Sequence, residues 1–213
     1  MTYHLQFTER MVGAFSFGED DYLVGYAAGQ RSGTDLMFRL TIATEDVDGF
    51  IADPSHPAVP QGYVASDALG GRRPVTSAAF NLFVDEGDHI RHMLYRLFFT
   101  DATDRPLTLA GYKDVKPAPL RQAWPETSTL YTRILAGHVP VTDGGAGATD
   151  GVVGSGVLRI RPADFAWQLT TFRVAGPTIA GRVSAFDRFG SLFIDELWQV
   201  FDPFRPGRRS APR

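Results

Sequence analysis

The chain has 213 residues, of which 44% are hydrophobic and 21% charged, as is ordinary for a globular protein. This length can bury a substantial core within one domain, and the composition excludes the disordered, collagen-like and coiled-coil classes. The formal net charge of -3 provides no overall basic field, which argues against nucleic acid and anionic membranes as partners.

The sequence contains no cysteine, which excludes disulfides, thiol nucleophiles and cysteine-ligated zinc. Met1 to Gly18 lacks the continuous apolar core of a signal peptide, and no apolar run approaches the roughly 18 residues that a membrane span needs. We therefore expect a cytoplasmic protein with no transmembrane segment.

The chain up to Ile160 predicts mostly strands. Alternation with period two places Leu36, Phe38, Leu40 and Ile42 on one face of a strand. A short helix capped by Thr44 is expected next, and Asp53-Pro54 should end it. Further strands are expected at Tyr22 to Ala27, Gln61 to Ser66, Val75 to Val84, Ile90 to Phe99, Leu107 to Lys113, Thr127 to Leu135 and Val152 to Ile160.

The C-terminal part predicts two helices. Pro162 suits the first position of a helix, and Asp164 suits its first turn. From Arg182 to Phe201, apolar residues recur at a spacing of three to four, which predicts a helix packed on the sheet. The last residues, 203–213, are rich in proline and arginine and predict a flexible tail.

The sequential strands favour a mainly β (α+β) fold, an antiparallel β-barrel or strongly curved sheet of the calycin-like kind, with two C-terminal helices. No internal repeat or shift in composition divides the chain. We expect a single barrel-like domain over residues 1–202.

Three motifs were weighed and set aside. Gly151 to Gly156 is followed by a strand and by no lysine-serine pair, so it is no phosphate-binding loop. Ser32 in Gly29 to Gly33 is out of register for a nucleophile elbow. His89 and His92 would lie on opposite faces of a strand, so we expect no metal site.

A set of polar residues lies within otherwise apolar strands, where burial without partners would cost several kcal/mol. An eight-stranded barrel can be filled by side chains or can hold one small ligand. We therefore take these residues as candidates for ligand binding, and their alternative role is to form the outer face of the sheet. They are Asn81, Tyr95, Arg96, Tyr112, Lys113, Tyr131, Arg133 and His138.

Several segments together resemble an accessory domain of bacteria. This domain accompanies cholesterol oxidase-like flavin oxidoreductases of the glucose-methanol-choline type, often in longer chains that also contain an α/β-hydrolase region. The segments are Phe7 to Met11, Leu69 to Gly71, Phe80 to Val84, Met93 to Leu97, Leu107 to Lys113, Trp124 to Thr127, Leu130 to Leu135, Asp164 to Leu169 and Phe186 to Trp198.

The resemblance implies a setting in lipid or sterol metabolism and assigns no reaction to the domain. The glycine fingerprint of a flavin-binding enzyme should follow an N-terminal strand and open a helix, and the sequence has no such element. We therefore expect no cofactor.

Three functions agree with the sequence, which leaves open whether the protein is an enzyme. The first is an auxiliary module that binds a lipid or sterol-like molecule in a barrel cavity. The second is a cofactor-independent isomerase, cyclase or hydrolase that uses Tyr95, Lys113, Tyr131 or His138 as acid or base. The third is an interaction module that docks a flavin oxidoreductase or a hydrolase.

Overall fold

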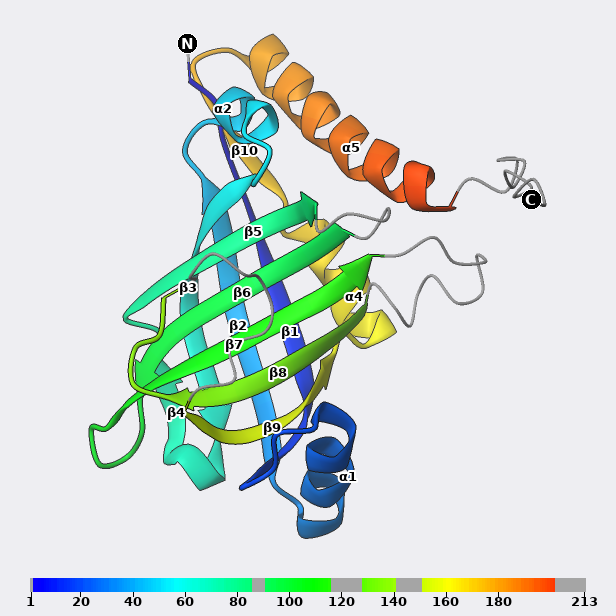
Figure 1. Ribbon diagram of the computed structural model, residues 1–213. Coiled ribbons are helices and arrows are strands. Elements are labelled where there is room, and N and C mark those ends of the chain that lie inside the picture. Colours follow the sequence, from blue (N-terminus) through cyan, green and yellow to red (C-terminus); the bar gives the residue numbers. More distant parts are fainter. Residues whose placement is uncertain (1, 86–90, 116–127, 141–150, 202–213) are drawn as a thin grey trace, which may run out of the picture.

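The structure is a computed structural model that describes residues 2–85, 91–115, 128–140 and 151–201. One antiparallel sheet of ten strands dominates it (Figure 1). The strands are β1 (His4–Phe17), β2 (Asp35–Thr44), β3 (Pro57–Ser66), β4 (Gly71–Pro74), β5 (Ser77–Asp85), β6 (Arg91–Thr100), β7 (Pro106–Val115), β8 (Thr129–Ala136), β9 (Val152–Arg159) and β10 (Arg173–Ala175). The helices are α1 (Tyr22–Ser32), α2 (Val47–Ala52), the 3₁₀ turn η1 (Asp67–Leu69), α4 (Pro162–Thr170) and α5 (Ile179–Phe201).

The sheet closes on itself. The strand order is β1-β2-β3-β5-β6-β7-β8-β9, and β9 pairs back with β1 from Val12↔Arg159 to Phe17↔Gly154. The short strands β4 and β10 lie outside this ring and pair with β3 and β1. The result is a closed, eight-stranded, antiparallel barrel, which confirms the predicted fold class.

The alternation of each strand sorts its side chains between the interior and the outside. Leu36, Phe38, Leu40 and Ile42 of β2 all point into the core and are at most 1% exposed, as their spacing predicts. Phe15 of β1 and Leu97 of β6 are also fully buried in this core. The barrel interior is therefore mostly filled by apolar side chains.

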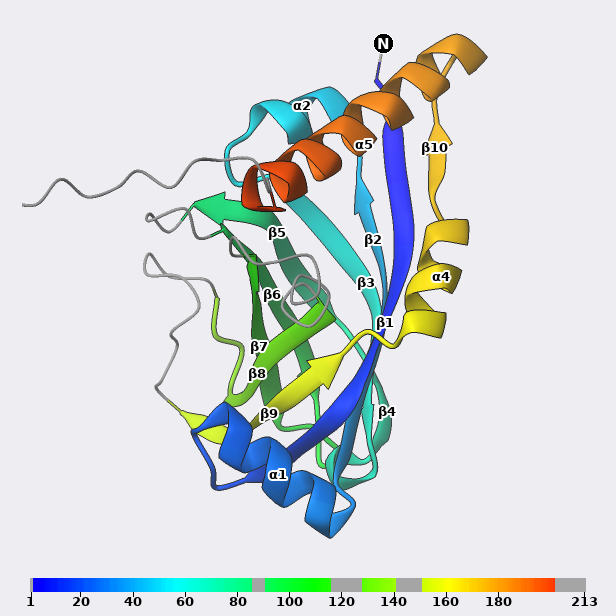
Figure 2. The ribbon, with the colours of Figure 1, turned by 90° about the vertical axis from the view of Figure 1, so that its right-hand side faces the viewer.

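Helices α5 and α2 cover one end of the barrel, and α1 lies near the opposite end (Figures 1 and 2). Phe189 of α5 packs on Phe50 of α2, with 5.9 Å between the ring centroids. Arg188 also forms an ion pair with Asp48, which joins the two helices at the surface. Helix α4 packs along the outside of β1 (Figure 2), where Asp164 pairs with Arg10.

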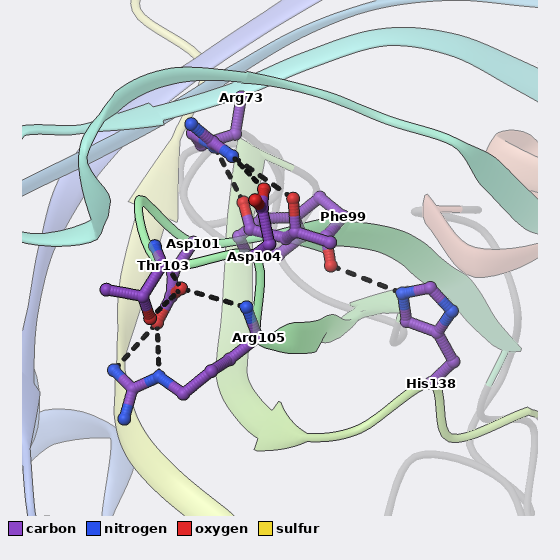
Figure 3. Close-up of polar contacts among 8 residues, drawn as sticks. Arg73, Phe99, Asp101, Thr103, Asp104, Arg105 and His138 are labelled. Carbon is purple, nitrogen blue, oxygen red and sulfur yellow. Dashed lines mark hydrogen bonds and ion pairs between the residues drawn. The ribbon is translucent and has the colours of Figure 1, made fainter.

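The end of the barrel away from α5 is tied together by the turn between β6 and β7 (Figure 3). Arg73 of β4 donates from Nε to the Thr100 carbonyl oxygen at 2.7 Å, which joins β4 to the end of β6. The Asp101 carboxylate accepts hydrogen bonds from Thr103 and Arg105. Burial raises the pKa of Asp101, but these hydrogen bonds outweigh that effect and hold the pKa well below its usual range.

Two local predictions were wrong. Tyr22 to Ala27 belongs to helix α1, because the Asp21 carboxylate caps it by accepting from the amides of Leu23 and Val24, both at 2.9 Å. Asp46 rather than Thr44 caps α2, since Thr44 is the last residue of β2. The predicted helices near the C-terminus are present as α4 and α5, and the predicted tail lies outside the described residues.

Helix α1 packs unusually close to the seam between β1 and β9. A Cβ atom on Gly25 would lie 2.2 Å from the Ser155 carbonyl oxygen, and one on Gly29 would lie 2.2 Å from that of Phe15. Both contacts are with backbone atoms, which cannot rotate away. The helix can reach the strands only because these two positions have no side chain.

Gly25→Ala should therefore destabilise the fold by about 1–3 kcal/mol, because the new methyl group overpacks the seam. Gly190→Ala in α5 is the matched control, since a Cβ there meets no atom within 4 Å. That change should raise stability by about 0.5–1 kcal/mol by removing a flexible glycine from a helix. Urea unfolding followed by circular dichroism measures both changes, and equal effects would contradict the packing argument.

Candidate functional site

The structure divides the eight candidate residues among three places. Tyr95 and Lys113 point into the barrel and are 1% and 3% exposed. Four others lie on the outer face of the neighbouring strands β6, β7 and β8, namely Arg96, Tyr112, Tyr131 and Arg133. Asn81 and His138 bind backbone carbonyl oxygens at strand ends, those of Ser55 and Phe99.

The two interior candidates share a partner that the sequence reasoning missed. Glu9 of β1 is 2% exposed, and its Oε1 lies 2.5 Å from Lys113 Nζ. The Tyr95 hydroxyl donates to Glu9 Oε2 at 2.9 Å. The sequence does carry a signal for Glu9, which is a carboxylate at an inward position of a strand, between Phe7 and Met11. We refer to Glu9, Tyr95 and Lys113 as the interior cluster.

The interior cluster spans the barrel. Glu9 lies on β1 and Tyr95 on β6, and these strands are four steps apart in either direction around the ring of eight. The Tyr95 ring lies edge-on to Phe80 at 4.9 Å, and Lys113 Nζ lies 5.1 Å from the centre of the Tyr95 ring. This polar contact thus links opposite walls within a mostly apolar interior.

Burial has consequences for the charges of this cluster. It strongly disfavours the tyrosinate, so it raises the pKa of Tyr95 well above the usual value, and the Glu9 carboxylate raises it further. Tyr95 is therefore a neutral hydrogen-bond donor at physiological pH. Glu9 and Lys113 form a pair with no net charge, and removal of one partner leaves the other uncompensated.

An apolar chamber lies beside the interior cluster, at the end of the barrel under α5. The space that a water-sized sphere can occupy in it is about 10 Å³, enough for roughly one water molecule. The walls come from the barrel and from both covering helices. They consist of Leu5, Phe7, Ile42, Thr44, Phe50, Ala58, Phe80, Leu82 and Phe189.

The chamber and the interior cluster are neighbours. Phe7 lines the chamber, and Glu9 is the next inward residue of β1. Phe80 also lines the chamber and packs edge-on against Tyr95. The interior cluster therefore lies next to the lining of the chamber without being part of it, and Phe189 contributes to that lining from α5.

The outer-face candidates form a separate group that fastens α1 to the barrel. The Tyr22 ring lies 5.7 Å from those of both Tyr112 and Tyr131, and Arg133 stacks over it at 4.5 Å. Burial, together with Tyr22 and Asp114, raises the pKa of Tyr112 to about 12. These contacts agree with the alternative that cross-strand pairs on the outer face hold these residues.

The remaining chemistry of the described residues is limited. They contain no group of three or more histidine, cysteine, aspartate or glutamate residues that could hold a metal ion. His92 lies 3.0 Å from Asp114, and His89 falls outside the described residues. No described helix is both long and apolar enough to cross a membrane.

The comparisons with known proteins supply no relative. The chain matches no known protein family, no curated protein and no solved structure.

Tyr95→Phe should alter the response of stability to alkaline pH. Because the folded-state pKa of Tyr95 lies above the unfolded value near 10, the tyrosine stabilises the fold below pH 10 and that contribution falls as the pH rises further. The loss of stability between pH 9 and about 11 should be smaller in Tyr95→Phe than in the wild type.

Urea unfolding at each pH measures this difference. Tyr63→Phe is the control, because Tyr63 lies on the outer side of β3 under Arg72. An unchanged pH slope in Tyr95→Phe would contradict the assigned role of the buried hydroxyl.

Proposed function

We propose that this barrel is an auxiliary module that binds an apolar small molecule in the chamber under α5. The observation that carries the proposal is an apolar space at one end of a closed barrel, with the polar interior cluster next to its lining. Ligand pockets commonly combine apolar walls with a few placed polar groups. A fatty acyl chain or a sterol is the ligand class that the resemblance suggests.

The two ends of the barrel support different roles. Arg73 and the turn after β6 join neighbouring strands at the far end through backbone and side-chain hydrogen bonds. At the other end, the chamber is closed by side chains of separate helices, Phe50 and Phe189. We assign access to the α5 end, because a helix can move there without breaking strand pairing.

Ligand binding requires the chamber to enlarge, because its present space suits only about one water. Phe189 is 5% exposed and reaches the chamber from α5. Displacement of this one ring would open the chamber toward the end of the barrel. In this structure the chamber is thus nearly filled, and a side chain of the protein itself, that of Phe189, helps to close it.

The alternative function as an enzyme receives less support from the geometry. Tyr131 lies on the outer face of β8, and His138 binds the Phe99 carbonyl oxygen beyond the strand, so neither lines the chamber. Neither Tyr95 nor Lys113 is among the residues that line the chamber, and each binds Glu9. Docking to a flavin oxidoreductase or hydrolase remains compatible with a binding barrel, which would then hold the partner's substrate or product.

Ala58→Phe tests the position of the ligand. Ala58 lines the chamber, so a larger side chain should weaken binding of the neutral probe N-phenyl-1-naphthylamine at least about tenfold, or ~1.4 kcal/mol. Val59→Phe is the matched control, because Val59 is the next residue of β3 and is 56% exposed. Fluorescence titration measures both affinities, and an equal response of the two variants would contradict a site in the chamber.

Phe189→Ala tests whether the Phe189 ring blocks entry to the chamber. If the Phe189 ring must move before a ligand enters, replacing it with alanine should raise the affinity for the probe. The open conformation would then form without the free energy needed to displace the ring. Phe186→Ala is the control on the same helix, because Phe186 is 47% exposed. An unchanged or lower affinity of Phe189→Ala, with its fold intact by circular dichroism, would remove α5 from the access route.

A further inference from the structure

The single lysine inside the barrel is unusual for this chain. Of its 21 basic residues only Lys113 and Lys116 are lysines, so arginine occupies the other positions. Lys113 is 3% exposed on an inward position of β7. Lysine differs from arginine here because its ammonium is compact and can lose a proton, whereas a guanidinium stays charged.

Lys113 has hydrogen-bonding capacity that the described residues do not use. An ammonium group carries three N–H donors. In the described part of the chain, Glu9 Oε1 is the only hydrogen-bond acceptor for Nζ, and the Tyr95 ring face lies 5.1 Å away. Two donors therefore have no acceptor among the described residues, and inside a mostly apolar barrel an unmet donor is costly and calls for a partner.

The charge of the interior cluster limits what that partner can be. Glu9 and Lys113 already neutralise each other, so a ligand carboxylate would bring an uncompensated negative charge next to Glu9. A carbonyl oxygen adds no charge. It also brings no donor of its own that would need a further acceptor in the apolar surroundings.

We propose that Lys113 donates a hydrogen bond to the carbonyl oxygen of an apolar aldehyde or ketone held in the chamber. This inference rests on the proposed function and names the ligand class for the same site. The ligand's apolar part would contact Phe7, Phe80 and Phe189, and its carbonyl would point to the interior cluster. Glu9 and Tyr95 position the amine, because each of the two Glu9 oxygens accepts from one of the cluster's donors.

The first test compares ligands of equal chain length. Dodecan-2-one should displace N-phenyl-1-naphthylamine from the wild type at a concentration at least about tenfold lower than dodecanoate does, because only the acid adds charge. Lys113→Met should weaken the binding of dodecan-2-one, because the variant lacks the donor for its carbonyl oxygen. Ala58→Phe should weaken the binding of both ligands, since it fills their common space.

The second test follows Lys113 in the wild-type protein and so does not depend on the folding of Lys113→Met. A dodecanal carbonyl held at Nζ can condense with the lysine. A carbon–nitrogen double bond forms, the carbonyl oxygen leaves as water with two ammonium protons, and the iminium keeps the third proton beside Glu9. Added cyanoborohydride supplies a hydride that reduces the iminium to a stable secondary amine.

Mass spectrometry and peptide mapping then locate the dodecyl group. We expect modification of Lys113 in the folded protein, its persistence in Lys116→Arg, and its loss when Ala58→Phe blocks the chamber. Modification confined to Lys116 or to the N-terminal amine would overturn the proposal.

The outcomes also separate this inference from the proposed function. Probe binding that responds to Ala58→Phe, without ketone preference and without modification of Lys113, would overturn the carbonyl assignment and leave the binding barrel intact. Absence of binding by the probe and by both dodecyl ligands would overturn the proposed function as well.

Discussion

The contact between Glu9, Tyr95 and Lys113 determines how the interior of this barrel is divided. It joins β1 to β6 and β7 across the axis, among inward side chains that are mostly apolar. Two ionised groups placed there cost desolvation energy that only their mutual contact offsets. Their contact, with the Tyr95 hydroxyl on the same carboxylate, links opposite walls of the barrel next to the chamber.

The two ends of the barrel consequently differ in mechanical character. Hydrogen bonds from Arg73 and from the Asp101 carboxylate join backbone segments at one end. At the other end, helix α5 is held by side-chain contacts, which include those of Phe189 with Phe50 and Phe172 and the surface pair of Arg188 with Asp48. Exposed ion pairs contribute little, so the covering helix is the more easily displaced part. The proposed access route follows from this difference.

The sequence predicted the barrel because alternation survives in each wall strand, as in Leu36 to Ile42. The prediction from sequence was wrong where a single residue, rather than the spacing of apolar side chains, decided the local structure. Asp21 turns an apolar run into a helix through its cap, and Gly25 and Gly29 let that helix lie on the seam. Tyr95 and Lys113 were found as polar residues in apolar strands, but their partner Glu9 lies about a hundred residues earlier, and only the strand order brings it near. Periodicity also could not tell which candidates point outward, as Arg133 and Tyr131 do.

The pairing of β1 with β9 affects how the chain folds. Val12 pairs with Arg159, so the ring closes through two strands that lie far apart in the sequence. Such distant pairing slows the search for the native state. Until then, β1 presents an open edge to any other extended chain. Helix α1, which follows β1 directly and lies over the same seam, is placed to shield that edge in newly made protein and so to guard against aggregation before the ring closes.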